Sequence, residues 1–367
     1  MKVNVAILGA GCAGLALARC LKEQGFSGSV SLLESRQCYE NDRTWCYWAK
    51  PDSQWHKMAQ YRWQQCLFSS LNDAQHIHYY DSTSYCCLPA ENYYDFCLQQ
   101  LDSANVSLKM EVEVVSVSPT RSQSWVVETT AGNLEADIVI DTRPRPCEAI
   151  LYQSFLGYEV TLSRPIFAPD TVRLMCNMHG DNQCMRFYYI LPFSPWHILI
   201  EPTVFHRYPL NPELLKDDLQ AALRAEDIEI ESIIRRESAI LPMGQTHLEG
   251  SVLVKGGIAG GALRASSGYG FLRIQAWALA CAQSIITKQK AFSHQQHHLQ
   301  ARMDHLFLNV IKHNPVDGPD YFIRMASQLN GDQFSAFMSD EAGMKEWMQV
   351  ISALPKWPFI KEVMAGG

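Results

Sequence analysis

Alternating apolar and polar runs predict a βαβ unit over residues 3–34. Residues 3–8 form the short apolar run of a buried strand, and residues 15–21 repeat apolar side chains at helical spacing. A second apolar run over residues 29–33 predicts a parallel strand that ends on Glu34.

Three glycines, Gly9, Gly11 and Gly14, join the first strand to the helix in the spacing of a dinucleotide-binding turn. The first allows a tight turn, the second lets the backbone approach a pyrophosphate, and the third lets helix and strand pack closely. Free N–H groups at the helix start would face the phosphates, and Glu34 would accept hydrogen bonds from a ribose. Because flavoprotein oxidoreductases commonly open with this unit, we expect FAD rather than NAD.

Further along, the pattern predicts elements of both types. An aromatic stretch without clear periodicity over residues 41–63 predicts an ordered loop, and residues 90–101 predict a helix. Residues 106–117 and 125–130 alternate like paired strands. Residues 136–141 form a buried strand that we expect to rejoin the first sheet.

Two later segments add candidate cofactor contacts. Asp141 ends the strand just described, and Arg143 follows it, where it would contact a phosphate or ribose or else form a surface salt bridge. Residues 252–257 predict a further buried strand, followed by a glycine-dense turn and a helix. Such a turn is typical of a second flavin contact through bare backbone, although a tight turn packed on the sheet gives the same pattern. The glycines assigned to this contact are Gly257, Gly260, Gly261 and Gly268.

The remaining patterns predict a sheet and a helical tail. Apolar and polar residues alternate in a set of short segments separated by Pro and Asp turns, which predicts an antiparallel substrate-binding sheet. These segments are residues 157–162, 172–177, 185–191 and 196–204. Residues 212–225 predict an amphipathic helix, and residues 299–311 carry an apolar stripe at helical spacing. Core packing explains such a stripe, and the alternative is that it lines a lipid tunnel or touches a membrane surface.

Together these patterns predict an α/β fold: a Rossmann-like FAD-binding sheet with an antiparallel substrate-binding sheet and a helical C-terminal tail. Residues 1–150 and 250–290 would bind FAD, and residues 151–249 would bind the substrate. Residues 291–367 would form the tail, which we interpret as a lipid or substrate-access region.

Composition narrows the function. The 367 residues are 47% hydrophobic and 19% charged, as in a globular protein, and the net charge of −7 argues against a nucleic-acid partner. The twelve cysteines include no C-x-x-C pair, so we expect no metal site. The histidines of residues 294–298 are interpreted as a solvated loop rather than as metal ligands. Without a signal peptide the cysteines should be reduced, in the cytoplasm.

Several segments carry a more specific signal than these patterns. Besides residues 3–34, they are Asn41–Trp48 (NDRTWCYW), Gln153–Glu159 (QSFLGYE), Arg186–Ser194 (RFYYILPFS), Leu199–Glu201 (LIE), residues 260–269, residues 331–332 and residues 337–338. Together they resemble the FAD-dependent lycopene cyclases of bacteria and plants, over nearly the whole chain. The nucleotide motif is shared by many flavoproteins, whereas the other segments are much more specific.

The resemblance implies a lycopene β-cyclase, whose reaction has no net redox change. A terminal alkene of a linear polyene is protonated, the neighbouring double bond attacks the cation, and proton loss leaves the β-ionone ring of β-carotene. The resemblance also implies FAD in its reduced form, with NAD(P)H as reductant, because an electron-rich flavin stabilises a nearby cation. An acid that stays protonated near neutral pH is needed as well, and apolar burial of a carboxyl provides one.

Glu201 is the carboxyl that fits this role, since it ends an apolar run and matches the first acid of the family's Leu/Ile-Glu-Asp/Glu-Thr motif. Pro202 replaces the second acid, while Thr203 is retained. Either Glu201 acts alone or a different base removes the final proton. An ordinary strand-end glutamate facing water is the alternative interpretation.

The resemblance assigns further residues around the cofactor and the substrate. Asp42, Arg43 and Trp45 would lie near the flavin ring or the substrate entry, with ordering of their own loop as the alternative. We assign Arg43 to the cofactor, and Asp42 and Trp45 to the substrate. Phe193 and Tyr269, within family-like segments, are assigned to the substrate too. Residues 174–177 lack the acid that the family usually carries there, which bears on substrate identity.

Two rival functions remain open. A flavin monooxygenase using NAD(P)H and O2 would share the βαβ unit, but it needs a Gly-Asp pair where this chain has Gly257 before Ile258. A non-catalytic flavin-bearing protein would bind a polyene without turnover.

Because a polyene resides in bilayers and no apolar run is long enough to span one, we expect peripheral binding to the inner face of the cytoplasmic membrane. The tail, with Trp357 and Phe359, is the expected contact.

Overall fold

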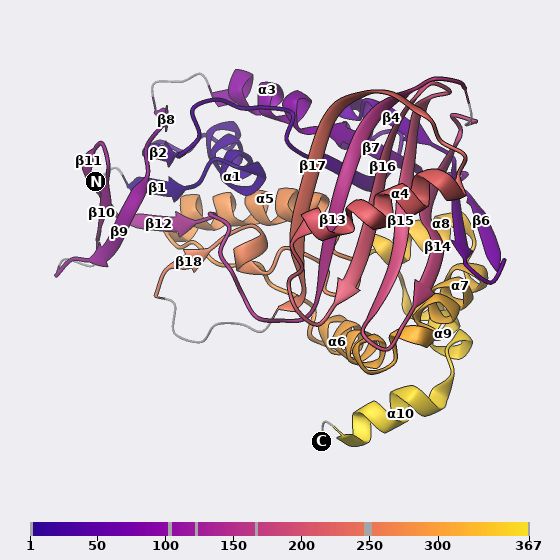
Figure 1. The fold of residues 1–367 in the computed structure, drawn as a ribbon. Coiled ribbons are helices and arrows are strands. Elements are labelled where there is room, and N and C mark those ends of the chain that lie inside the picture. Colours follow the sequence, from indigo (N-terminus) through magenta and orange to yellow (C-terminus); the bar gives the residue numbers. More distant parts are fainter. Residues whose placement is uncertain (1–2, 102–104, 122–123, 166–167, 246–251, 366–367) are drawn as a thin grey trace.

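The computed structural model describes residues 3–101, 105–121, 124–165, 168–245 and 252–365. Within these residues the chain forms a parallel sheet with helices on one face and, beside it, a larger, mainly antiparallel sheet (Figure 1). Most of the C-terminal helices gather at the large sheet, and α10 (Lys356–Ala365) projects from them toward the C-terminus (Figure 1). The predicted α/β fold with an antiparallel sheet and a helical tail is confirmed.

The parallel sheet carries the dinucleotide-binding turn. Its strands run in the order β18-β12-β1-β2-β8, each parallel to its neighbours. Their bounds are β1 (Asn4–Leu8), β2 (Ser29–Leu33), β8 (Val106–Lys109), β12 (Ile138–Asp141) and β18 (Val254–Lys255). This order confirms the predicted βαβ unit and the return of residues 136–141 to the same sheet.

Helices cover one face of this sheet, and a small antiparallel sheet covers the other. Strand β1 alternates accordingly: Val5 and Ile7 belong to the core with the helices, whereas Ala6 and Leu8 pack against the small sheet. The helices are α1 (Cys12–Glu23), α3 (Ala90–Leu101) and α5 (Phe271–Lys288), and the small sheet contains β9 (Val114–Pro119), β10 (Trp125–Thr129) and β11 (Gly132–Ala136). The pairing of β9 with β10 confirms part of the predicted strand pair, whereas residues 106–109 of the same predicted segment form β8 of the parallel sheet.

The large sheet has seven strands in the order β17-β13-β16-β15-β14-β5-β6. Their bounds are β5 (Gln65–Ser70), β6 (Gln75–Tyr79), β13 (Ala149–Leu162), β14 (Thr171–Gly180), β15 (Cys184–Ser194), β16 (His197–His206) and β17 (Ile230–Gln245). The sheet expected within residues 151–249 therefore extends beyond that range, because β5 pairs in parallel with β14 and β6 pairs with β5. The expected domain boundary at residue 250 lies outside the described residues.

The two faces of this sheet have different partners. On β16, Ile198 and Ile200 pack against α4 (Lys216–Ala225), which follows the 3-10 turn η1 (Pro212–Leu215). Leu199 points to the opposite face, where a second core joins the sheet to the C-terminal helices. Glu201 has the same parity as Leu199, so it shares the face that looks inward.

The predicted loop over residues 41–63 is wrong. It contains strand β3 (Thr44–Ala49), helix α2 (Gln54–Met58) and strand β4 (Tyr61–Trp63), and β7 (Ser84–Pro89) lies between the two strands. Tyr47 is buried in one core and Trp48 in the other, so both faces of β3 are covered. A strand buried on both faces carries no polar alternation, and the usual strand signal is lost.

The tail is helical, as predicted. Its elements are α6 (His298–His313), η3 (Pro315–Asp317), α7 (Gly318–Gln328), α8 (Gly331–Met338), α9 (Met344–Ala353) and α10 (Lys356–Ala365). Val310 and Ile311 of the predicted stripe are buried in the core of the large sheet. Across the described residues, none of the helices combines the length and apolar character needed to cross a bilayer.

Candidate active site

A cavity of about 710 Å³ lies between the two sheets. Gly9, Gly11 and Glu34 line it at the dinucleotide-binding turn. Tyr189 and Glu201 line it on the antiparallel sheet. The predicted cofactor turn and the predicted acid therefore face one continuous space.

The three glycines of the turn have separate structural roles. Gly9 has φ +92°, which a side chain would strain. A Cβ at Gly14 would lie 2.0 Å from the Gly9 carbonyl oxygen, so α1 can approach the strand only without a side chain there. A Cβ at Gly11 would meet nothing within 4 Å. Gly11 begins α1 without a side-chain cap, so N–H groups of the first turn are left to bind a ligand at the cavity.

Glu34 is buried directly after β2 and held as an anion. It accepts hydrogen bonds from the Ala10 N–H at 2.8 Å and from the Arg36 N–H at 3.1 Å, and the Arg36 side chain forms an ion pair with it at 3.1 Å. Burial alone would raise the pKa of Glu34, but the hydrogen bonds and charge of Arg36 lower it. Arg36 also lines the cavity and was missed from the sequence.

Basic residues line the cavity near this turn. Arg43 is exposed on the wall, and Arg143 lies on the wall beside Gly9. Asp141 is not on the wall: its carboxylate accepts hydrogen bonds from Arg143 at 2.9 Å and Arg145 at 2.8 Å. Asp141 therefore orients Arg143 from behind the cavity surface.

The late glycines divide into two groups. Gly257 (φ +62°) and Gly268 (φ +73°) line the cavity with bare backbone. Gly260 and Gly261 shape the 3-10 turn η2 (Ile258–Gly260) behind it: a Cβ at Gly260 would lie 2.3 Å from a backbone oxygen, and Gly261 has φ +85°. The start of α5, at Phe271, also faces the cavity.

These features fit FAD. The uncapped start of α1, the open space above Gly11 and the basic wall suit a pyrophosphate, and Glu34 suits a ribose. Gln153 Oε1 and Ser267 Oγ, from residues that line the same cavity, are buried without a hydrogen-bond partner among the described residues. Such atoms indicate a polar ligand, because native proteins seldom leave buried polar groups unpaired.

Glu201 lies within β16 and not at its end. Its strand neighbour is Tyr189 of β15, and both side chains line the cavity. Burial raises the pKa of Glu201 well above its usual range, and the nearby Glu237 and Cys46 raise it further, against a smaller opposing effect of Arg235. A carboxyl in this setting keeps its proton to higher pH than an exposed one and can donate that proton into the cavity.

The residues assigned to the substrate are only partly together. Asp42, Trp45 and Tyr269 line the cavity. Phe193 lies outside the described cavity walls and stacks on Tyr61 with ring centroids 4.3 Å apart. Tyr189 was missed, although it lies within the predicted strand over residues 185–191; only its register with Glu201 identifies it.

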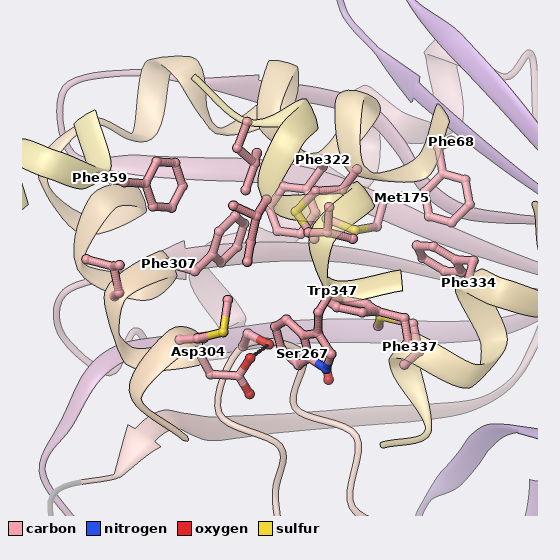
Figure 2. Close-up of a pocket in the computed structure, with 18 of the residues that line it drawn as sticks. Phe68, Met175, Ser267, Asp304, Phe307, Phe322, Phe334, Phe337, Trp347 and Phe359 are labelled. Atoms are coloured by element: carbon pink, nitrogen blue, oxygen red, sulfur yellow. Dashed lines mark hydrogen bonds between the residues drawn. The ribbon is translucent and has the colours of Figure 1, made fainter. Parts of the chain in front are cut away.

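A second, apolar cavity of about 380 Å³ adjoins the first. Tyr189, Ser267 and Tyr269 line both cavities, so the two spaces meet at these residues. Figure 2 shows aromatic rings from the sheet and the tail, among them Phe307, Phe322 and Phe334, turned toward this space. Part of the predicted apolar stripe, Met303, Leu306 and Phe307 of α6, lines it.

Solved structures of similar fold are flavoproteins and related enzymes. A geranylgeranyl bacteriochlorophyll reductase-like protein from Thermoplasma acidophilum superposes with a TM-score of 0.63 at 10% identity, covering 99% of each chain. A variant of HpxO from Klebsiella pneumoniae, complexed with FAD, gives 0.60 at 12% identity and covers 93% of this chain and 98% of that one. At these identities the likeness shows the fold alone.

Sequence comparison is more specific. A lycopene beta-cyclase from Paracoccus sp. (strain N81106 / MBIC 01143) is 34% identical over 122 residues. That match covers 31% of this chain and only 30% of the relative's length. A family model described as "Lycopene cyclase protein" matches residues 4–364, nearly the whole chain. The predicted resemblance is confirmed: the chain belongs to the lycopene cyclase protein family.

Proposed function

We propose that the protein is a lycopene β-cyclase that uses reduced FAD and converts linear polyene end groups to β-ionone rings. The observation that carries this proposal is the junction of the two cavities. A half-buried acid, Glu201, stands where an apolar space meets the space that fits FAD, and Tyr189 and Tyr269 border both. A polyene lying in the apolar space would present its end group there.

The apolar cavity suits a hydrocarbon chain. Aromatic, Met and aliphatic side chains make up nearly all of its wall. The buried carboxylate on the wall, Asp304, is neutralised by Arg264 at 3.3 Å and accepts a hydrogen bond from Ser266 at 2.8 Å. A substrate without polar groups would therefore lose no hydrogen bonds on entering.

The chain's own residues supply proton transfer and protection of the cation. Glu201 would donate its proton to the terminal alkene, and the rings of Tyr189 and Tyr269 border the space where positive charge develops. Burial raises the pKa of both phenols, so they remain neutral. The apolar walls would keep water from capturing the cation. Reduced FAD, when bound, supplies an electron-rich group that stabilises nearby positive charge.

The proposal includes NAD(P)H as the reductant of FAD. The reaction is redox-neutral, so NAD(P)H would be needed only to bring FAD to its reduced state, not once per turnover. In an assay without oxygen, a chemical reductant should replace NAD(P)H. Product formed in large excess over NAD(P)H consumed supports the cyclase.

The test is expression in a lycopene-accumulating host, with pigments analysed by chromatography. Conversion of lycopene to a cyclised isomer, absent with Glu201→Gln, supports the proposal. Unchanged lycopene with a folded, flavin-loaded protein contradicts it. Steady NAD(P)H oxidation coupled to oxygen uptake would instead indicate the monooxygenase, and tight pigment binding without turnover the carrier protein.

A larger side chain in the apolar cavity should block the substrate. Leu306 of α6 lines the cavity. Leu306→Trp is expected to reduce cyclisation about 10-fold or more, because the larger indole would fill space that the substrate needs. Leu299→Trp, on the same helix but 60% exposed and off the cavity wall, is the control. Equal activity of the two variants would contradict a polyene in this space. Flavin content should be normal in both.

We also propose that α10 binds the inner face of the cytoplasmic membrane as a peripheral contact. Trp357 and Met364 are 70% and 75% exposed, while Phe359 and Ile360 of the same helix line the apolar cavity. An apolar helix that is both on the surface and on the cavity wall would let a polyene pass from bilayer to cavity. The proposed partners are thus a polyene and a lipid surface, with neither nucleic acid nor metal.

Trp357→Glu should weaken membrane binding, because a charge in place of an exposed aromatic opposes insertion into the lipid interface. In flotation with vesicles of phosphatidylcholine and phosphatidylglycerol, the wild type should float and the variant should stay largely in the soluble fraction. Val115→Glu replaces a side chain of similar exposure on β9 and should float like the wild type. A wild type that does not float contradicts the proposal.

A further inference from the structure

A second glutamate stands beside Glu201 across one strand. Glu237 of β17 pairs with Gly157 of β13, and β16 with Glu201 lies on the other side of β13. A Cβ built on Gly157 would meet Glu237 Cγ at 3.0 Å and Glu201 Cγ at 3.5 Å. The two side chains therefore lean over the same glycine, which leaves room for both.

The two carboxyls have opposite surroundings. Glu237 is buried and accepts hydrogen bonds from Arg235 Nη1 at 2.5 Å and from Thr44 Oγ1 at 2.9 Å. Hydrogen bonds from a cation and a hydroxyl favour the ionised form. For Glu201, no hydrogen bond or ion pair to its carboxyl is found in the part of the chain that the structure describes. Only the charge of Arg235 favours its anion, and that effect is smaller than those that oppose it.

The charges around Arg235 also indicate that the proton lies on Glu201 and not on Glu237. This single guanidinium already serves two carboxylates, Glu237 and Glu159, with Glu159 also hydrogen-bonded by His197 at 2.7 Å. A third carboxylate beside them would be an uncompensated charge in a poorly solvated site, which is unfavourable. The proton of the pair therefore resides on the carboxyl without donors.

We propose that Glu237 is a positioning residue for the acid: an anchored carboxylate that keeps the proton on Glu201. It would take the place of the second acid that Pro202 removes from the family's motif. The assignment rests on the proposed function, because that function makes Glu201 the proton donor. Glu237 lies off the cavity wall, so it acts through Glu201 and not on the substrate.

The groups that face Glu201 determine whether Glu237→Gln raises or lowers the pKa of Glu201. They are Glu237 and Arg235 of β17, Cys46 of β3 and Tyr189 of β15. Burial raises the pKa of Glu201 most, followed by the charge of Glu237. Glu237→Gln removes that charge, so the pKa of Glu201 should fall and the acid should lose its proton at lower pH.

The direct test is infrared spectroscopy of the carbonyl band of a protonated carboxyl, recorded against pH in the flavin-loaded protein. The wild type should keep a band at neutral pH that Glu201→Gln abolishes. In Glu237→Gln the same band should disappear about 1–3 pH units lower. The alkaline limb of the kcat profile should shift by the same amount, with KM little changed.

Two controls separate this role from loss of structure. Glu237→Asp keeps the charge and should restore the wild-type limb. Glu226→Gln removes a carboxylate that pairs with Arg173, away from the cavity, and should leave the limb in place. If Glu237→Gln does not fold, Thr44→Val, which removes one donor to Glu237, should lower kcat on the plateau of the pH profile, because the proton shared by the two carboxyls shifts toward Glu237.

An unchanged band and limb in folded Glu237→Gln, or an unchanged plateau kcat in Thr44→Val where the first does not fold, would overturn the assignment. An equal shift in Glu226→Gln would do the same, because it would show a general response of the sheet. If the band behaves as expected but no polyene is cyclised, the proposed function fails while the carboxyl pair stands.

Discussion

Glu201→Gln is expected to lower polyene cyclisation by about 10²–10⁴-fold, the usual scale of general acid catalysis. The substitution keeps the shape of the side chain but removes the proton that starts the reaction. Among the described residues that line the cavity, Glu201 is the only carboxyl on the inward face of β16. The next residue is Pro202, which cannot replace it as an acid. Initial rates in the purified, anaerobically reduced protein give the comparison.

The variant should otherwise resemble the wild type. Its flavin content should be unchanged, since Glu201 lines the cavity from β16 and not from the dinucleotide-binding turn, and polyene binding should persist. Activity of the wild type should fall as pH rises through the raised pKa of Glu201, because only the protonated form donates. Activity within a few-fold of wild type in Glu201→Gln would transfer the acid role to another residue.

Local spacing explains why the cofactor end of the cavity could be predicted. Gly9, Gly11, Gly14 and Glu34 serve their roles within one βαβ unit, whose geometry follows from a short stretch of sequence. The same holds for Gly257, which turns the chain with a positive φ after β18. In both places the residue type follows from the local backbone conformation.

Register across strands explains what could not be predicted. Glu237 and Tyr189 flank Glu201 only because β17, β13, β16 and β15 are neighbours in that order. No spacing in the sequence encodes this alignment. Strand β17 was itself missed: it is an edge strand with many exposed positions, so apolar residues do not alternate along most of its length.

Parity along one strand can also mislead. Tyr189, Leu191 and Phe193 share a face of β15, and the first two line the FAD-sized cavity. Phe193 lies outside the cavity and packs on Tyr61. The sequence thus identified the correct face, but Phe193 packs on a residue of β4, a strand that the predicted loop over residues 41–63 did not include.

Gly11→Val is expected to abolish FAD binding while leaving the protein folded. Gly11 has φ −75°, which any residue can adopt, and a Cβ there would meet no protein atom within 4 Å. The valine would therefore project into the cavity at the start of α1, where the phosphates are expected. Flavin absorbance after purification and on titration with FAD measures the loss.

Gly14→Ala is the matched contrast at the same turn. Its added methyl would lie 2.0 Å from the Gly9 carbonyl oxygen, so the helix must move away from the strand. This variant should lower the thermal midpoint of the flavin-free protein, whereas Gly11→Val should not. Because both glycines belong to one motif, the two outcomes separate a ligand-facing glycine from a packing glycine. Stoichiometric flavin in purified Gly11→Val would mean that the phosphates bind elsewhere than at the start of α1.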